Sequence, residues 1–77
     1  MQLTVSFVGP IKRPWPEMKR EIQVEEGLTL EHLLISLGYR REDLGRVIIT
    51  VNGKKRPPSA EPADGDEVCV VLLAGGG

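Results

Sequence analysis

The sequence has one cysteine, Cys69, and one histidine, His32, among its 77 residues. A single thiol cannot form an internal disulfide or a multi-thiolate zinc or iron–sulfur site, and His32 has no second ligand at metal-binding spacing. We therefore expect no metal site, a solvated position for His32 on a helix, and a structural role for Cys69 as a small apolar side chain. A domain of this size must then be stabilised by packing alone.

Long apolar segments are also missing. The longest uninterrupted apolar run, residues 68–74, is seven residues long, whereas a helix needs about 20 apolar residues to cross a bilayer. The chain begins with alternating apolar and polar residues rather than a basic stretch followed by an apolar run, so no signal peptide is predicted. These features favour a cytoplasmic protein of one domain with no membrane partner.

Neither sign of charge predominates, because 10 basic and 11 acidic residues give a net charge of −1. The basic residues gather in three clusters, at 12–20, 40–46 and 54–56, but acidic residues balance them. One Trp, one Tyr and one Phe also offer little surface for stacking on bases. We expect no nucleic-acid partner. The clusters are interpreted as solvated surface, with the alternative that one of them steers association with an acidic partner protein.

The residues of hydrolytic or phosphate chemistry are scarce as well. With one histidine and no glycine-rich turn from a strand into a helix, the sequence offers no Ser-His-Asp triad and no phosphate-binding loop. Paired catalytic carboxylates cannot be assembled either. We predict that the protein is not itself an enzyme.

What the sequence does contain is clear periodicity. Alternation of apolar and polar residues predicts strands at 2–8 and 19–25. Three prolines between residues 10 and 16 predict a long connecting loop, which carries Trp15. The two strands are expected to pair as an antiparallel hairpin.

A helical period follows at Thr29, whose hydroxyl can accept hydrogen bonds from first-turn amides. One apolar stripe at i, i+3, i+4 and i+7 is formed by Leu30, Leu33, Leu34 and Leu37. Gly38 then supplies a left-handed stop. The pattern predicts one helix of about two and a half turns.

The C-terminal half predicts three more strands. A strand at 46–52 leads into the turn dipeptide Asn52-Gly53, and a short strand at 54–56 folds back from it. The last strand, at 67–73, is apolar on both faces, as expected of a central strand in a sheet with one face covered by a helix. The chain is therefore expected to be an α+β domain with a mixed sheet, in which the first and last strands lie side by side.

Three local features occur in a specific order along the chain. Gly27-Leu28-Thr29 leads into the leucine-rich helix, and Val51-Asn52-Gly53 ends the third strand. Asp64-Gly65-Asp66-Glu67-Val68 precedes an apolar strand and three terminal glycines that end on Gly77. Each feature is weak alone. Together, in a chain of this size, they resemble the ThiS/MoaD family of ubiquitin-like sulfur carrier proteins over nearly the whole length.

The resemblance implies a fold and a domain organisation. The fold is the ubiquitin-like β-grasp, in which a mixed sheet of four to five strands wraps around one helix, and it agrees with the element order predicted above. It would occupy residues 1–73, followed by a flexible C-terminal glycine tail at 74–77.

The resemblance also implies the site. Gly77, preceded by Gly76, would be adenylated by an activating enzyme that uses ATP, and its carboxylate would then become a thiocarboxylate. The implied partners are that enzyme, a persulfide sulfur donor and a downstream synthase that accepts the sulfur. No tightly bound cofactor is implied. Thiamine, molybdopterin and thiolated tRNA all stay open as the product.

Glycine suits such a terminus, because it adopts whatever backbone angles a narrow channel requires and presents no Cβ to a nucleophile. Gly75 lengthens the reach. Ordering each glycine on docking costs about 1–2 kcal/mol of backbone freedom, so another surface must supply affinity. The alternation places Ile48, Val71 and Leu73, with Val8 as a further candidate, on the sheet face away from the helix, and we expect the partner to dock there.

Alternatives stay open at this point. The protein could be a modifier whose Gly77 forms an isopeptide bond with a lysine of another protein, since the same activation step serves both functions. It could also be a passive interaction domain, with terminal glycines that are only a frayed end or a cloning scar. Nothing in the sequence requires more than a monomer.

Overall fold

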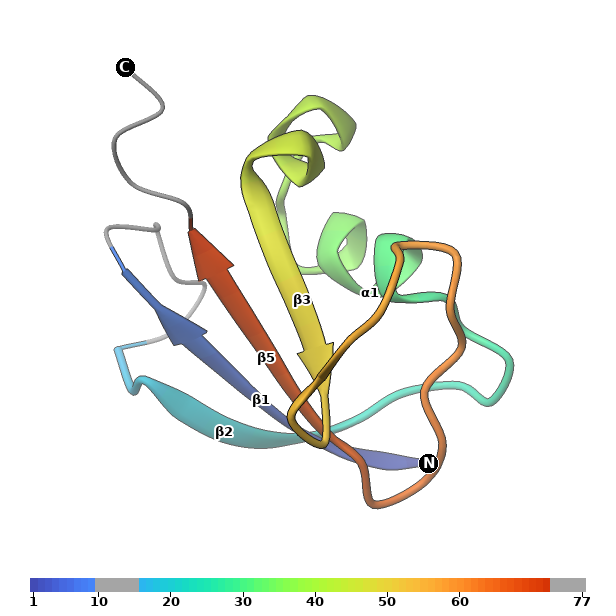
Figure 1. The fold of residues 1–77 in the computed structure, drawn as a ribbon. Coiled ribbons are helices and arrows are strands. Elements are labelled where there is room, and N and C mark those ends of the chain that lie inside the picture. Colours follow the sequence, from blue (N-terminus) through green and yellow to red (C-terminus); the bar gives the residue numbers. More distant parts are fainter. Residues whose placement is uncertain (10–15, 73–77) are drawn as a thin grey trace.

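The predicted strands form one mixed sheet, whose two N-terminal strands pair as a hairpin. A computed structural model describes residues 1–9 and 16–72. The strands are β1 (Gln2–Val8), β2 (Lys19–Gln23), β3 (Val47–Val51), β4 (Lys54–Lys55) and β5 (Glu67–Leu72). Their order across the sheet is β2-β1-β5-β3-β4 (Figure 1). β1 is antiparallel to β2 and parallel to β5, and β5 is antiparallel to β3. The hairpin, the central last strand and its pairing with the first strand are thus confirmed.

Helix α1 (Leu30–Ser36) packs across one face of this sheet (Figure 1). The predicted cap is present, because the Thr29 hydroxyl accepts a hydrogen bond from the His32 amide at 3.1 Å. Two further first-turn amides donate to the backbone carbonyls of Ala60 and Pro58, at 2.9 and 2.8 Å. The segment after β4 therefore holds the start of the helix and fixes it relative to the sheet.

Nine apolar side chains form the core between the helix and the sheet. They come from β1, β3, β5 and α1: Leu3, Val5, Phe7, Leu30, Leu33, Leu34, Ile49, Val68 and Val70. Burial of each such side chain contributes about 1.5–3 kcal/mol relative to its exposure. The predicted leucine stripe and the inward residues of the first strand all belong to this set, except Leu37, which is half-buried beside it.

Several boundaries differ from the sequence prediction, and β3 and β4 are shorter than the strands predicted at 46–52 and 54–56. β2 ends at Gln23, two residues early, although Val24 still exchanges backbone hydrogen bonds with Met1 at 2.9 and 2.7 Å. Between α1 and β3 the chain forms a 3-10 helix, η1 (Arg41–Arg46), which the pattern did not predict. It has no apolar stripe to reveal it, and Leu44 alone packs on the core. In the part of the chain that the structure describes, no helix has the length and apolar character needed to cross a bilayer.

Candidate functional site

The central strand β5 carries the chain to the C-terminal glycines. Its buried residue Val70 pairs with Phe7 of β1 and with Ile49 of β3, so both edges of β5 are held in the sheet. Leu72 ends the strand opposite Val47. The predicted site residues Leu73, Gly75, Gly76 and Gly77 lie outside the described residues. The structure therefore describes the strand β5 that precedes these residues.

An apolar row crosses the outer face of the sheet beside the end of β5. The register pairs Val71 with Val8 on one side and with Ile48 on the other. Val8 is 43% exposed, and the other two side chains are half-buried. Two predicted docking residues and the further candidate Val8 thus share one row across three strands. We call these three residues the outer row.

The next row along the same face is polar at its edges. Cys69 of β5 pairs with Ser6 and Thr50, and these pair in turn with Lys19 and Lys55 at the two sides of the sheet. Cys69 is half-buried on this outer face and is not part of the core. Two lysines therefore flank the face that carries the outer row.

Gly9 shapes the point where the chain leaves the sheet, a role that sequence reasoning missed. Its φ of +93° lies in the left-handed region, and a Cβ built on it would come within 3.1 Å of the Leu72 carbonyl oxygen. Its close approach to Leu72 depends on the parallel pairing of β1 with β5, which no local pattern reveals.

Two of the sequence features behind the resemblance, Val51-Asn52-Gly53 and the segment 64–68, meet at the opposite end of β5. The Asn52 side chain donates to Asp66 Oδ1 at 2.9 Å and accepts from the Glu67 amide at 2.9 Å. Asp66 Oδ2 accepts from the Ala63 amide at 2.8 Å. The hydrogen bond from Ala63, and then that from Asn52, lowers the pKa of the Asp66 carboxyl. Asn52 itself has a positive φ of 53°. These residues fasten the β3-β4 hairpin to the start of β5 and are structural.

No metal centre emerges from residues 1–9 and 16–72, among which no three His, Cys, Asp or Glu side chains are grouped to hold an ion. His32 is exposed on α1. The candidate site therefore consists of the outer row and of the terminal glycines that follow β5.

A five-stranded mixed sheet, one helix across it and a central last strand define a ubiquitin-like β-grasp protein, and solved structures agree. SAMP1 from Haloferax volcanii superposes with a TM-score of 0.74 at 13% identity and full coverage of both chains. A putative molybdopterin converting factor subunit 1 from Pyrococcus furiosus gives 0.72 at 23% identity, covering 92% of this chain and 95% of that one.

A third similar structure contains a partner. It is the complex of subunits 1 and 2 of the molybdopterin-converting factor from Helicobacter pylori, with a TM-score of 0.63, 26% identity and full coverage of both compared chains. The search of curated proteins returned no match. The ThiS family model matches residues 7–77, so the chain belongs to the ThiS family. This is a family of small ubiquitin-like carrier proteins.

Proposed function

We propose that this protein is a sulfur carrier whose Gly77 carboxylate is adenylated by an activating enzyme and converted to a thiocarboxylate. The chain would be a co-substrate of that enzyme in the cytoplasm and would bind no cofactor of its own tightly. ATP would be consumed in the enzyme's site. The sulfur would pass to a synthase that makes a cofactor or a thiolated product.

One observation carries this proposal. The match to the ThiS family extends to residue 77, so Gly75, Gly76 and Gly77 are part of the family pattern. An accidental glycine extension would not be expected to fall inside that pattern. The rigid, doubly paired β5 ends at Leu72, five positions before Gly77, and so leaves only a short segment to enter an enzyme's cleft.

The chemistry follows from the terminal carboxylate. As an anion with a reference pKa near ~3.5, it resists nucleophilic attack at neutral pH. Attack of its oxygen on the α-phosphorus of ATP forms the acyl-adenylate and releases pyrophosphate. Hydrosulfide then attacks the acyl carbon, the bond to the AMP oxygen breaks, and loss of a proton leaves the thiocarboxylate and free AMP.

Docking would use the outer row. Val8 exposes 43% of its surface next to Val71 and Ile48, at the end of the sheet where β5 stops. Apolar side chains on the otherwise polar face of a sheet commonly mark a protein interface. A similarly folded subunit 1 of a molybdopterin-converting factor has been solved together with its subunit 2, which supports a role in protein assembly.

The decisive experiment is intact mass spectrometry of the full chain. The protein is incubated with a cognate activating enzyme, ATP and sulfide, and a heavier species should appear whose excess mass is that of sulfur over oxygen. A chain lacking Gly77 is the matched control and should stay unchanged. If the complete chain also keeps its mass, while the same enzyme converts another carrier in a parallel reaction, the proposal is wrong.

A modifier function has its own support, because a similarly folded protein is the small archaeal modifier protein 1 of H. volcanii. Trypsin would leave a long remnant on a target lysine, since Arg56 is the last basic residue of the chain. An Ala74→Arg variant expressed in the source organism shortens that remnant to three glycines. Detection of this remnant on lysines would favour conjugation, and its absence beside a detected thiocarboxylate would favour the carrier alone.

A further inference from the structure

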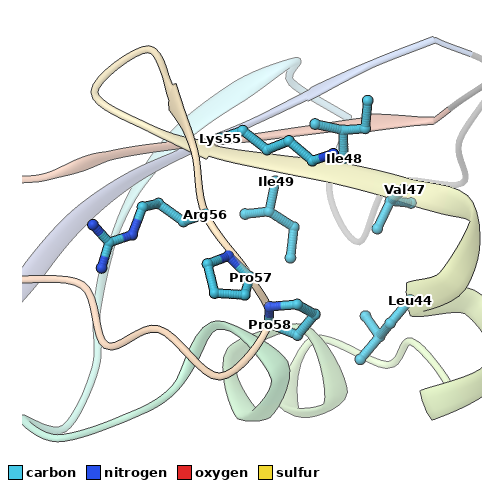
Figure 2. A pocket seen from close by; sticks show the side chains of 8 residues that line it. All are labelled: Leu44, Val47, Ile48, Ile49, Lys55, Arg56, Pro57 and Pro58. Carbon is cyan, nitrogen blue, oxygen red and sulfur yellow. The ribbon is translucent and has the colours of Figure 1, made fainter.

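An apolar groove lies along the free edge of β3 and shares one lining residue, Ile48, with the outer row. Figure 2 shows it between Ile49 and Val47 of β3, Leu44 of η1, and Pro57 and Pro58 after β4. Its volume is about 350 Å³. Ile48 lies on the other side of β3 from Ile49 in this view, and apart from Lys55 and Arg56 all lining residues are apolar.

The sheet is incomplete beside this groove. β4 has two residues and pairs only with Thr50 and Val51 of β3. The Arg56 amide adds one hydrogen bond to the Ile49 carbonyl at 2.9 Å, and Pro57 and Pro58 then follow, which have no amide hydrogen to donate. The first half of β3 therefore presents an edge that no strand of the described chain covers, and an extended segment could pair there.

The basic side chains that the structure describes divide into two sets. One set is neutralised internally: Lys19 pairs with Glu67 at 3.3 Å, Arg20 with Glu17 at 2.7 Å, and Arg41 with Glu31 at 3.2 Å, and Arg40 lies 3.8 Å from both Glu42 and Asp43.

The other set lies within residues 46–56, and two of its members, Lys55 and Arg56, line the groove. Within the described ranges, the exposed side chains of Arg46, Lys54 and Lys55 form no ion pair or side-chain hydrogen bond. Arg56 has only a longer-range attraction to Asp66. Among the described residues, the basic side chains without an ion pair therefore lie between the end of η1 and the residue after β4.

We propose that this groove, with Lys55 on its outer side, binds an extended segment of a partner protein in which aliphatic and acidic residues alternate. On a strand added to the β3 edge, successive side chains point to opposite faces. Aliphatic side chains enter the groove on the core side, next to Ile49. Acidic side chains face the outer side, where Lys55 lies (Figure 2).

Two properties favour a peptide over a nucleic acid. The lining has no aromatic side chain on which a base could stack. Its floor is apolar and reaches the core residue Ile49, which is 3% exposed, so that a phosphate backbone would find no polar partner there. The experiment includes a single-stranded oligonucleotide, so that binding of a nucleic acid at this groove would be detected.

The test uses the complete chain and a fluorescein-labelled peptide of about eight residues in which Val and Leu alternate with Asp and Glu. Fluorescence polarisation should show binding that weakens when salt rises from about 50 to about 300 mM. Lys55→Glu should weaken it about tenfold. Lys19→Glu is the matched control, because it makes the same change at the opposite side of the sheet, and it should retain affinity. Amide chemical shifts should move at Val47, Ile48 and Ile49.

Three results would overturn the proposal. These are no binding by the complete chain, equal losses in the Lys55→Glu and Lys19→Glu proteins, or shift changes confined to Val8 and Val71. A single-stranded oligonucleotide that displaces the peptide and binds more tightly would also replace it with a nucleic-acid site. The assay contains neither activating enzyme nor ATP, so its outcome is independent of the proposed sulfur chemistry.

Discussion

At the scale of single residues, the most informative position is a glycine that faces a backbone oxygen. Gly9 has a φ of +93° and lies against Leu72, whereas Gly45 has no positive φ, and a Cβ added there would meet no atom within 4 Å. Tertiary packing thus requires a glycine at the first position but not at the second. Substitution of alanine at each position therefore tests whether the glycine is required.

Gly9→Ala should lower the free energy of unfolding by about 1–3 kcal/mol, because an L-residue is strained at this φ and its Cβ would press on the Leu72 carbonyl. Gly45→Ala should instead raise stability by about 0.4–1 kcal/mol through the unfolded chain. Urea denaturation followed by circular dichroism measures both. Equal effects in the two variants would contradict the role given to Gly9.

Asp66 gives the protein a defined pH dependence. Its folded-state pKa is lowered by the hydrogen bonds from Ala63 and Asn52. A lowered folded pKa means that the stabilisation is complete above the unfolded value of about 3.9 and is lost as the pH falls through the folded value.

Asp66→Asn should therefore cost about 0.5–1.5 kcal/mol at neutral pH, since an amide nitrogen would face one of the two donors. The difference from the natural protein should close below about pH 4. Urea midpoints measured from neutral to strongly acidic pH test this. A stability difference between the two proteins that stays constant over the whole pH range would show that the charge of Asp66 does not contribute to stability.

At the scale of elements, α1 depends on contacts at its first turn. The helix has only seven residues, too few to be stable without packing and caps. Thr29 satisfies the His32 amide, and the carbonyls of Pro58 and Ala60 satisfy two more. The leucines then bury the opposite face. The element is therefore as much a product of the segment after β4 as of its own propensity.

Thr29→Ala should destabilise the protein by about 1 kcal/mol, the usual cost of losing a side-chain N-cap. Ser59→Ala is the matched control, because Ser59 is exposed in the neighbouring segment and should change stability little. Thermal and urea unfolding give the values. If Ser59→Ala lost as much stability as Thr29→Ala, the loss could not be assigned to the N-cap hydrogen bond.

At the scale of the whole molecule, the sheet separates a buried face from an outer one. The core face carries the nine buried residues, and the outer face carries the outer row near the end of β5. Two exposed apolar residues then allow a matched comparison. Val8 is 43% exposed in the outer row, and Ile35 is 36% exposed on α1, which packs against the opposite face.

Val8→Ser should raise the KM for adenylation by the activating enzyme about fivefold or more, as loss of an interface contact worth about 1 kcal/mol would do. Ile35→Ser should leave KM unchanged, and thermal unfolding of both variants checks that the fold survives. Pyrophosphate release measures the reaction. An unchanged KM for Val8→Ser would remove the outer row from the docking surface, while leaving the chemistry of Gly77 untouched.

The sequence by itself determined the strands, the capped helix, their order and the family, because periodicity, caps and turn dipeptides act within a few residues of one another. It also indicated that Ile48 and Val71 point away from the core, since alternation fixes which residues share a face. Tertiary structure alone decided the rest. The register that joins Val8, Val71 and Ile48, the contact of Gly9 with Leu72, and the groove beside β3 all depend on pairing between segments far apart in the chain, and no local pattern specifies such pairing. η1 belongs with them, because it is held by its contact with the core and not by a stripe of its own.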